Sequence, residues 1–168
     1  MKNIALVGFM GTGKTTIARI LAEKLGFECV DIDDLIEFTE GMKIVDIFGQ
    51  KGEAYFRDVE KEVVRKAAAQ AKKVIACGGG VVLNENNIIN LKQNGFIVCL
   101  SASPEVILER TKNYPHRPLL NVEDKAGKIK EMLEFRQPYY ATADYTVNTS
   151  DLTKEEVVDR ILELVNSA

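Results

Sequence analysis

Eight residues near the start of the chain have the types and spacing of a phosphate-binding loop: Gly8-Phe9-Met10-Gly11-Thr12-Gly13-Lys14-Thr15. They fit the pattern G-x-x-x-x-G-K-[ST] at every fixed position. Glycines in such a turn let backbone N–H groups point inward toward phosphate oxygens. Lys14 adds a positive charge for the outer phosphates, and the hydroxyl of Thr15 can bind Mg²⁺. The pattern predicts a nucleotide site rather than a glycine-rich turn that matches by chance.

Two carboxylates, Asp31 and Asp33, follow a second apolar run. If the chain is still extended there, both side chains share one face. One could then hold magnesium through a bound water, while the other could face the hydroxyl group that attacks ATP. Helix capping is the competing interpretation. Asp34 with Glu37 already fits a D-x-x-E capping box, however, which leaves Asp31 and Asp33 available for chemistry.

Three glycines, Gly78-Gly79-Gly80, follow a third apolar run. They would allow the backbone to approach a ligand closely, but a plain loop would explain them equally well.

Three arginines could bind anions. Arg57 lies four residues after Glu53, a spacing that equally suits an ion pair on a helix surface, and Arg136 is similarly ambiguous. Arg117 lies in a segment with two prolines and no periodicity, so it could close over a transferring phosphoryl group.

Short apolar runs alternate with helical patterns along the whole chain, so the elements that would position these residues form an α/β fold. The predicted strands are Asn3–Val7, Glu28–Asp31, Lys73–Cys77, Gly95–Ser101 and Tyr145–Val147. The predicted helices are Lys14–Leu25, Asp34–Glu40, Ile44–Phe48, Glu53–Gln70, Glu85–Gln93, Pro104–Lys112, Lys125–Tyr140 and Lys154–Asn166. This alternation predicts three layers, a parallel sheet between helices. Ligands of such sheets bind beyond the carboxyl ends of the strands, where the candidate residues fall.

The composition is that of a single domain spanning residues 1–168. The net charge of −3 indicates no broad basic face for nucleic acid. No segment has the length of a membrane span, and the apolar start is too short for a signal peptide. Three cysteines without paired spacing, Cys29, Cys77 and Cys99, suggest reduced thiols and a cytoplasmic protein.

Six stretches recur here in the order and spacing of a known family: GFMGTGKTTIARILA, VDIDDLIE, KIVDIFGQKGEAYFRDVEKEVV, GGGVV, HRPLL and FRQPYY. On these the chain resembles shikimate kinases over nearly its whole length. The resemblance implies ATP-dependent phosphorylation of the 3-hydroxyl of shikimate, a step toward chorismate and the aromatic amino acids. It also implies a P-loop kinase fold with a five-stranded parallel sheet, a mobile lid at about residues 113–123 and a substrate-binding region at about residues 33–60.

The resemblance assigns the shikimate site by position. Asp33 would bind the shikimate hydroxyls and could act as the catalytic base. Arg57 and Arg136 would hold the carboxylate, which suits the planar fork of a guanidinium. Gly79, with its neighbours Gly78 and Gly80, would contact the ring.

The resemblance assigns the nucleotide site in the same way. The residues expected to wrap the phosphates of ATP are Gly11, Thr12, Gly13, Lys14, Thr15 and Thr16. Thr15 would ligate Mg²⁺, with Asp31 in the outer shell. Arg117 would reach ATP from the lid and share catalysis with Lys14 and Asp33. Arg110 and Pro118 could border the adenine.

Three alternative functions remain open at the level of sequence. A gluconate kinase of the same architecture would share the phosphate loop but would not need two arginines for a cyclic acid. A nucleotide kinase would need a second base-reading element. A binding protein that had lost catalysis would usually show damage at Lys14, Thr15 or Asp33, which are intact. We expect a monomer that acts on a small molecule, without nucleic acid or a membrane.

Overall fold

The computed structural model describes residues 2–112 and 123–168. The strands are β1 (Asn3–Val7), β2 (Glu28–Asp31), β3 (Lys73–Ala76), β4 (Gly95–Ser101) and β5 (Tyr145–Asn148). The α-helices are α1 (Lys14–Leu25), α2 (Ile32–Glu40), α3 (Ile44–Ala68), α4 (Glu85–Gln93), α5 (Pro104–Thr111), α6 (Lys125–Tyr140) and α7 (Lys154–Asn166), with a short 3₁₀ turn at Val81–Leu83.

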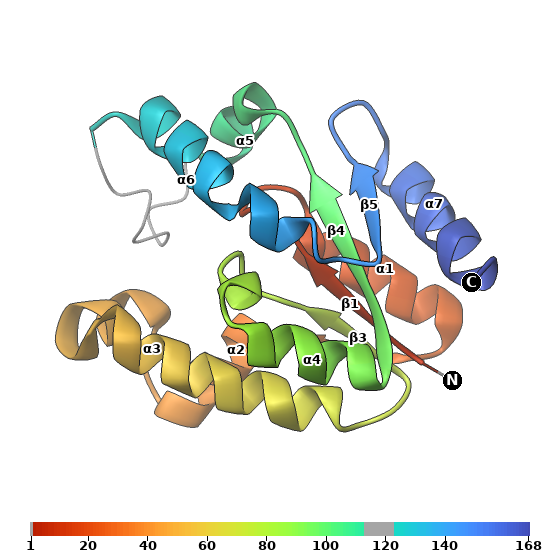
Figure 1. Cartoon of the computed structure of the whole chain (residues 1–168), viewed down its shortest axis with the longest axis horizontal. Coiled ribbons are helices and arrows are strands. Elements are labelled where there is room, and N and C mark those ends of the chain that lie inside the picture. The colour runs from red at the N-terminus through yellow and green to blue at the C-terminus, as the bar shows by residue number, and fades with distance from the viewer. Residues whose placement is uncertain (1, 113–122) are drawn as a thin grey trace.

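The five strands form one parallel sheet in the order β2-β3-β1-β4-β5. Helices α1 and α7 cover one face, and α3, α4 and α6 lie over the other (Figure 1). The central strand β1 is buried on both faces, because Ile4 and Leu6 pack toward α1 while Ala5 and Val7 pack toward α3 and α4. This arrangement confirms the predicted three-layer α/β fold.

The start of α2 corrects the predicted capping. Asp31, not Asp34, caps the helix, and its carboxylate accepts a hydrogen bond of 3.1 Å from the backbone N–H of Asp34. The expected Asp34–Glu37 box does not form, since Glu37 accepts instead from the backbone N–H of Ile44, at 2.9 Å. Asp33 therefore lies in the first turn of α2 rather than on an extended strand, so the expected shared strand face is wrong.

Helix α3 joins two helices that were predicted to be separate. A bend at Gly52, with φ 86° and ψ 169°, divides it into an entry segment and a long helix. Glycine adopts this positive φ without a steric penalty. The bend explains why the sequence predicted two helices, one ending at Phe48 and one beginning at Glu53. The helix ends at Ala68 rather than at Gln70, and the other predicted bounds are correct to within one residue apart from α2.

Among the described residues, none of the helices has both the length and the apolar character needed to cross a membrane.

Candidate active site

A cleft of about 490 Å³ lies at the carboxyl ends of the strands. It is bounded by the phosphate loop, α2, the start of α3, the loop after β3 and one side chain of α6. The residues that line it are Met10, Thr15, Arg19, Asp31, Asp33, Asp34, Glu37, Lys43, Ile44, Val45, Phe48, Phe56, Arg57, Glu60, Gly78, Gly79, Gly80 and Arg136. The cleft thus brings together predicted residues that are more than 100 positions apart in the sequence.

The phosphate loop leaves β1 and leads into α1, as predicted. Gly8 has φ 137°, and a Cβ atom there would lie 2.2 Å from the carbonyl oxygen of Leu100, so only glycine fits. The Nζ atom of Lys14 donates hydrogen bonds to the carbonyl oxygens of Gly8, at 2.7 Å, and Phe9, at 2.9 Å. The amine is therefore held inside the loop, beside the N-terminus of α1, where an anion is stabilised.

Thr15, the last residue of this loop, and Asp31, the last residue of β2, bring together two side chains whose oxygen atoms can ligate a metal ion. The hydroxyl of Thr15 donates a hydrogen bond of 2.9 Å to Oδ2 of Asp31. Mg²⁺ prefers oxygen ligands and is commonly held by one or two side chains together with nucleotide phosphates. The described residues contain no cluster of three acidic, histidine or cysteine side chains that would hold a metal alone. The pair therefore suits a magnesium ion that arrives with a nucleotide.

A second hollow of about 640 Å³ lies on the other side of the phosphate loop, between α5, α7 and the end of β5. Its wall includes Gly11, Thr12, Gly13, Thr16 and Arg110. The guanidinium of Arg110 donates to the carbonyl oxygen of Gly11, at 3.1 Å, and to that of Thr149, at 3.4 Å.

The predicted lid residues Arg117 and Pro118 lie outside the described residues. The assignment of Arg117 to ATP and that of Pro118 to the adenine border stay predictions.

The three consecutive glycines each face a different charged side chain. A Cβ atom on Gly78 would lie 2.9 Å from Oδ1 of Asp33, and one on Gly79 would lie 3.1 Å from Nη1 of Arg136. A Cβ on Gly80 would lie 2.5 Å from the Arg57 guanidinium. Because glycine has no side chain, these three positions leave room for the charged groups that lie against them.

Arg57 takes part in the expected ion pair and also lines the cleft. It bonds Glu53, the surface partner anticipated from sequence, at 3.3 Å. It also donates to both carboxylate oxygens of Glu60, at 3.0 and 3.2 Å. The surface interpretation is therefore incomplete, because Glu60 is only 1% exposed.

Glu60 is a residue of the site that the sequence analysis missed. Burial raises the pKa of its carboxyl group to about 7, although the positive charge of Arg57 opposes this rise. The negative charge of Asp33 adds to the increase. The spacing of three residues after Arg57 could have identified it as a helical partner.

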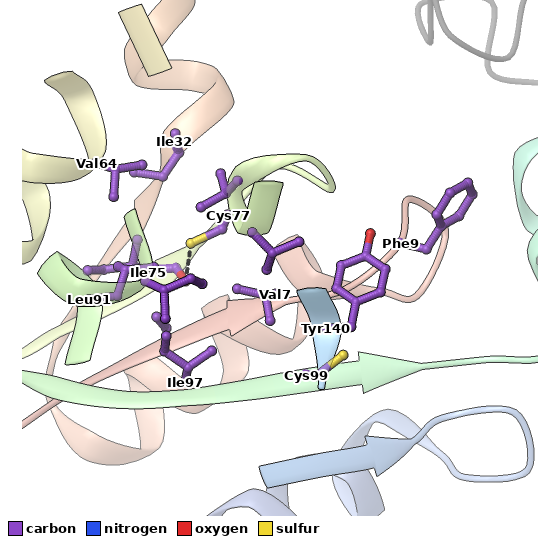
Figure 2. Packing of buried hydrophobic residues seen from close by; sticks show 14 of the residues in the cluster. Val7, Phe9, Ile32, Val64, Ile75, Cys77, Leu91, Ile97, Cys99 and Tyr140 are labelled. Atoms are coloured by element: carbon purple, nitrogen blue, oxygen red, sulfur yellow. Dashed lines mark hydrogen bonds between the residues drawn. The ribbon is translucent and has the colours of Figure 1, made fainter. Parts of the chain in front are cut away.

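Arg136 lies on α6 and is 3% exposed. Its Nη1 atom has no hydrogen-bond partner among the described residues. One turn later on the same helix, Tyr140 donates a hydrogen bond of 2.8 Å from its phenol to the carbonyl oxygen of Gly79. Figure 2 shows Tyr140 and Phe9 at the same end of the buried cluster, near the phosphate loop.

Comparisons with known proteins agree with this geometry. The family model described as shikimate kinase matches residues 10–166. A shikimate kinase of Thermodesulfovibrio yellowstonii is 49% identical over 163 residues, which cover 97% of this chain and 94% of that protein. One of Caldanaerobacter subterraneus is 51% identical over 162 residues, covering 96% and 95%.

Solved structures give the same result. The shikimate kinase from Acinetobacter baumannii in complex with shikimate superposes with a TM-score of 0.96 at 40% identity, covering 99% of this chain and 94% of that chain.

Proposed function

The chain belongs to the shikimate kinase family, and we propose that its cleft binds shikimate beside the outer phosphate of ATP. The enzyme transfers a phosphoryl group from ATP, with Mg²⁺, to the 3-hydroxyl of shikimate, a step toward chorismate and the aromatic amino acids. The observation that carries the assignment of the site is the arrangement around the glycine loop. An aspartate and two arginines converge there, and Gly79 lies close to the carbonyl oxygen of Gly8, which accepts a hydrogen bond from Lys14.

The substrate side of the cleft is proposed to act by charge and position. Arg57 and Arg136 bind the shikimate carboxylate, and the glycine loop lies against the ring. Asp33 binds the reacting hydroxyl and accepts its proton as the oxygen bonds to the γ-phosphorus. The bond from that phosphorus to the bridging oxygen breaks, and ADP leaves. In such a transfer the enzyme mainly positions the two reactants and stabilises the charge of the transition state.

The nucleotide side is proposed to use the phosphate loop as its anion site. Backbone N–H groups of residues 11–16 would bind the phosphates. The Nζ atom of Lys14 would exchange its bonds to loop carbonyls for bonds to phosphate oxygens. Thr15 would ligate Mg²⁺, with Asp31 in the outer shell, and the ion would neutralise charge on the outer phosphates. Arg110 would border the adenine.

We also propose that residues 113–123 form a lid that supplies Arg117 to ATP and Pro118 to the adenine. Two described features support this placement. Helix α5, which precedes the segment, contacts the phosphate loop through the bond from Arg110 to Gly11. The segment also joins α5 to α6, the helix that carries Arg136. A lid would exclude water from the reaction, which a kinase requires.

A coupled assay of ADP release tests the proposed function. Shikimate should stimulate ATP consumption strongly, whereas gluconate and AMP should not. Lys14→Ala provides the background rate, because it removes the positive charge from the phosphate loop. Equal stimulation by gluconate would move the assignment to the alternative kinase.

We further propose a cytoplasmic monomer. All three cysteines are free thiols, which is typical of a reducing compartment. Light scattering at the concentrations used for kinetics would test the oligomeric state.

A further inference from the structure

The environment of Arg136 differs from that of the other arginine in the cleft. Arg57 pairs with Glu53 and Glu60, so its charge is partly balanced within the protein. Within residues 2–112 and 123–168, Arg136 forms no salt bridge with a carboxylate, although its charge acts on Glu60 and its guanidinium interacts with the phenol of Tyr140. Its Nη1 atom is buried without a hydrogen-bond partner there. A buried cation with an unpaired donor is costly, so the groups packed against it must stabilise it.

The side chain beneath Arg136 is Phe9. The guanidinium carbon lies 5.7 Å from the centroid of the Phe9 ring, within the range of a cation–π interaction. The ring is 2% exposed, so water screens this attraction little. Gly79 lies close to the same guanidinium, since a Cβ atom there would be 3.1 Å from Nη1.

Phe9 is itself held firmly by the phosphate loop. Its carbonyl oxygen accepts hydrogen bonds from the hydroxyl of Thr12, at 2.7 Å, and from Nζ of Lys14, at 2.9 Å. These bonds fix the backbone that carries the ring. The phosphate-binding pattern does not require an aromatic residue at this position, so phosphate binding does not explain the ring.

We propose that Phe9 is a positioning residue for substrate recognition, and that its ring holds the guanidinium of Arg136, with its unpartnered Nη1 atom, ready for the carboxylate of shikimate. This inference rests on the proposed function, because it requires that Arg136 bind the carboxylate. The ring stabilises the cation without neutralising it, so the full positive charge remains available to the ligand. Arg57, the other arginine proposed to bind the carboxylate, shares its charge with Glu53 and Glu60.

The test compares shikimate with its neutral methyl ester in calorimetric titrations of Phe9→Leu and the parent protein. Leucine keeps the site apolar but removes the π-system. A desolvated cation–π contact is worth about 1–2 kcal/mol, which bounds the cost of holding Arg136 in place without the ring, so the dissociation constant for shikimate should rise by up to about five- to thirtyfold. The affinity for the methyl ester should not change, because the ester carries no charge for Arg136 to bind.

A matched control removes a similar contact elsewhere. Phe96→Leu takes away the ring that lies 4.8 Å from Nζ of Lys2, on β4, and should leave shikimate affinity unchanged. Phe9→Met is a second variant of similar volume, for use if leucine impairs folding. Thermal melting and titration with ATP check that each variant keeps its fold and its phosphate loop.

The outcomes separate the inference from the function on which it rests. A loss of affinity specific to the charged ligand supports the role of Phe9. An unchanged affinity for shikimate, or an equal loss for shikimate and the ester, overturns it while leaving the kinase assignment intact. A parent protein that neither binds nor phosphorylates shikimate would instead contradict the proposed function, and the inference with it.

Discussion

The phenol oxygen of Tyr140 donates a hydrogen bond of 2.8 Å to the carbonyl oxygen of Gly79, which ties helix α6 to the loop after β3. Burial raises the pKa of this phenol to about 12, although the charge of Arg136 opposes the rise, so the group remains a donor at neutral pH. The bond joins the helix that carries one arginine to the glycine that faces it.

Tyr140→Phe should weaken shikimate binding while leaving ATP binding unchanged. The substitution leaves the half-buried Gly79 carbonyl without its partner, which costs less than the roughly 1–3 kcal/mol of a fully buried group. We expect the KM for shikimate to rise about three- to tenfold and the melting temperature to fall by a few degrees. Tyr139→Phe, at the more exposed neighbouring position, is the control. A KM for shikimate equal to that of the parent would show that the bond does not position the loop.

Glu60 should make stability depend on pH. Because the folded pKa of about 7 lies above the ordinary value of 4.5, the folded state holds this proton more tightly than the unfolded state does. The carboxyl group therefore favours folding at low pH, and this contribution is lost as the pH rises from about 4.5 to about 7. Across that window the free energy of unfolding should fall by up to about 3 kcal/mol relative to Glu60→Gln.

Urea denaturation at a series of pH values measures this difference. Glu131→Gln, at an exposed position of α6, serves as the control and should follow the parent. Parallel profiles for the parent and Glu60→Gln would contradict the raised pKa.

Arg57→Lys and Arg136→Lys should each weaken shikimate binding more than ATP binding. Lysine keeps the charge but loses the planar fork that binds both carboxylate oxygens. Hydrogen bonds to charged groups are worth about 1.5–3 kcal/mol, so affinity should fall about ten- to a hundredfold. Calorimetry of both ligands gives the comparison, with Arg65→Lys, an exposed pair with Glu62, as the control. Unchanged shikimate affinity in both variants would leave these arginines with structural roles only.

Asp33→Asn should keep the fold and ATP affinity but lose most phosphoryl transfer. The amide retains the shape of the carboxylate but cannot accept the hydroxyl proton or carry the charge. A positioned general base contributes about 10²- to 10⁴-fold, and kcat should fall by that order. Single-turnover kinetics would measure the chemical step, with the exposed Asp58→Asn as the control. If turnover matches that of the parent, Asp33 only orients the substrate.

The elements were largely predictable from sequence, because strand and helix periods alternate clearly and the phosphate-binding pattern is specific. The start of α2 was not, since Asp31 and Asp34 are both good capping residues and only the position of the strand end decides between them. The bend at Gly52 depends on one backbone conformation, which the residue type permits but does not require.

The residues of the candidate site that sequence reasoning missed are those that act on other side chains. Glu60, Phe9 and Tyr140 each contact a predicted residue or its loop rather than open cleft space alone. Phe9 and Tyr140 contact segments far apart in the chain, whereas Glu60 pairs with Arg57 three residues away and its significance comes from its burial. The hydrophobic periodicity of the sequence shows only that such residues are buried or helical, and not which side chains they contact.

The unequal surroundings of Arg57 and Arg136 bear on inhibitor design. Because Arg57 shares its charge with Glu53 and Glu60, the carboxylate pocket offers little more than one unbalanced positive charge. A monoanionic headgroup matches that charge. A phosphonate dianion would place excess negative charge within the field of Glu60 and Asp33, and should gain less affinity than its extra charge suggests. Medicinal chemistry on this pocket should therefore preserve a single negative charge and seek further affinity from the apolar wall formed by Val45, Phe48 and Phe56.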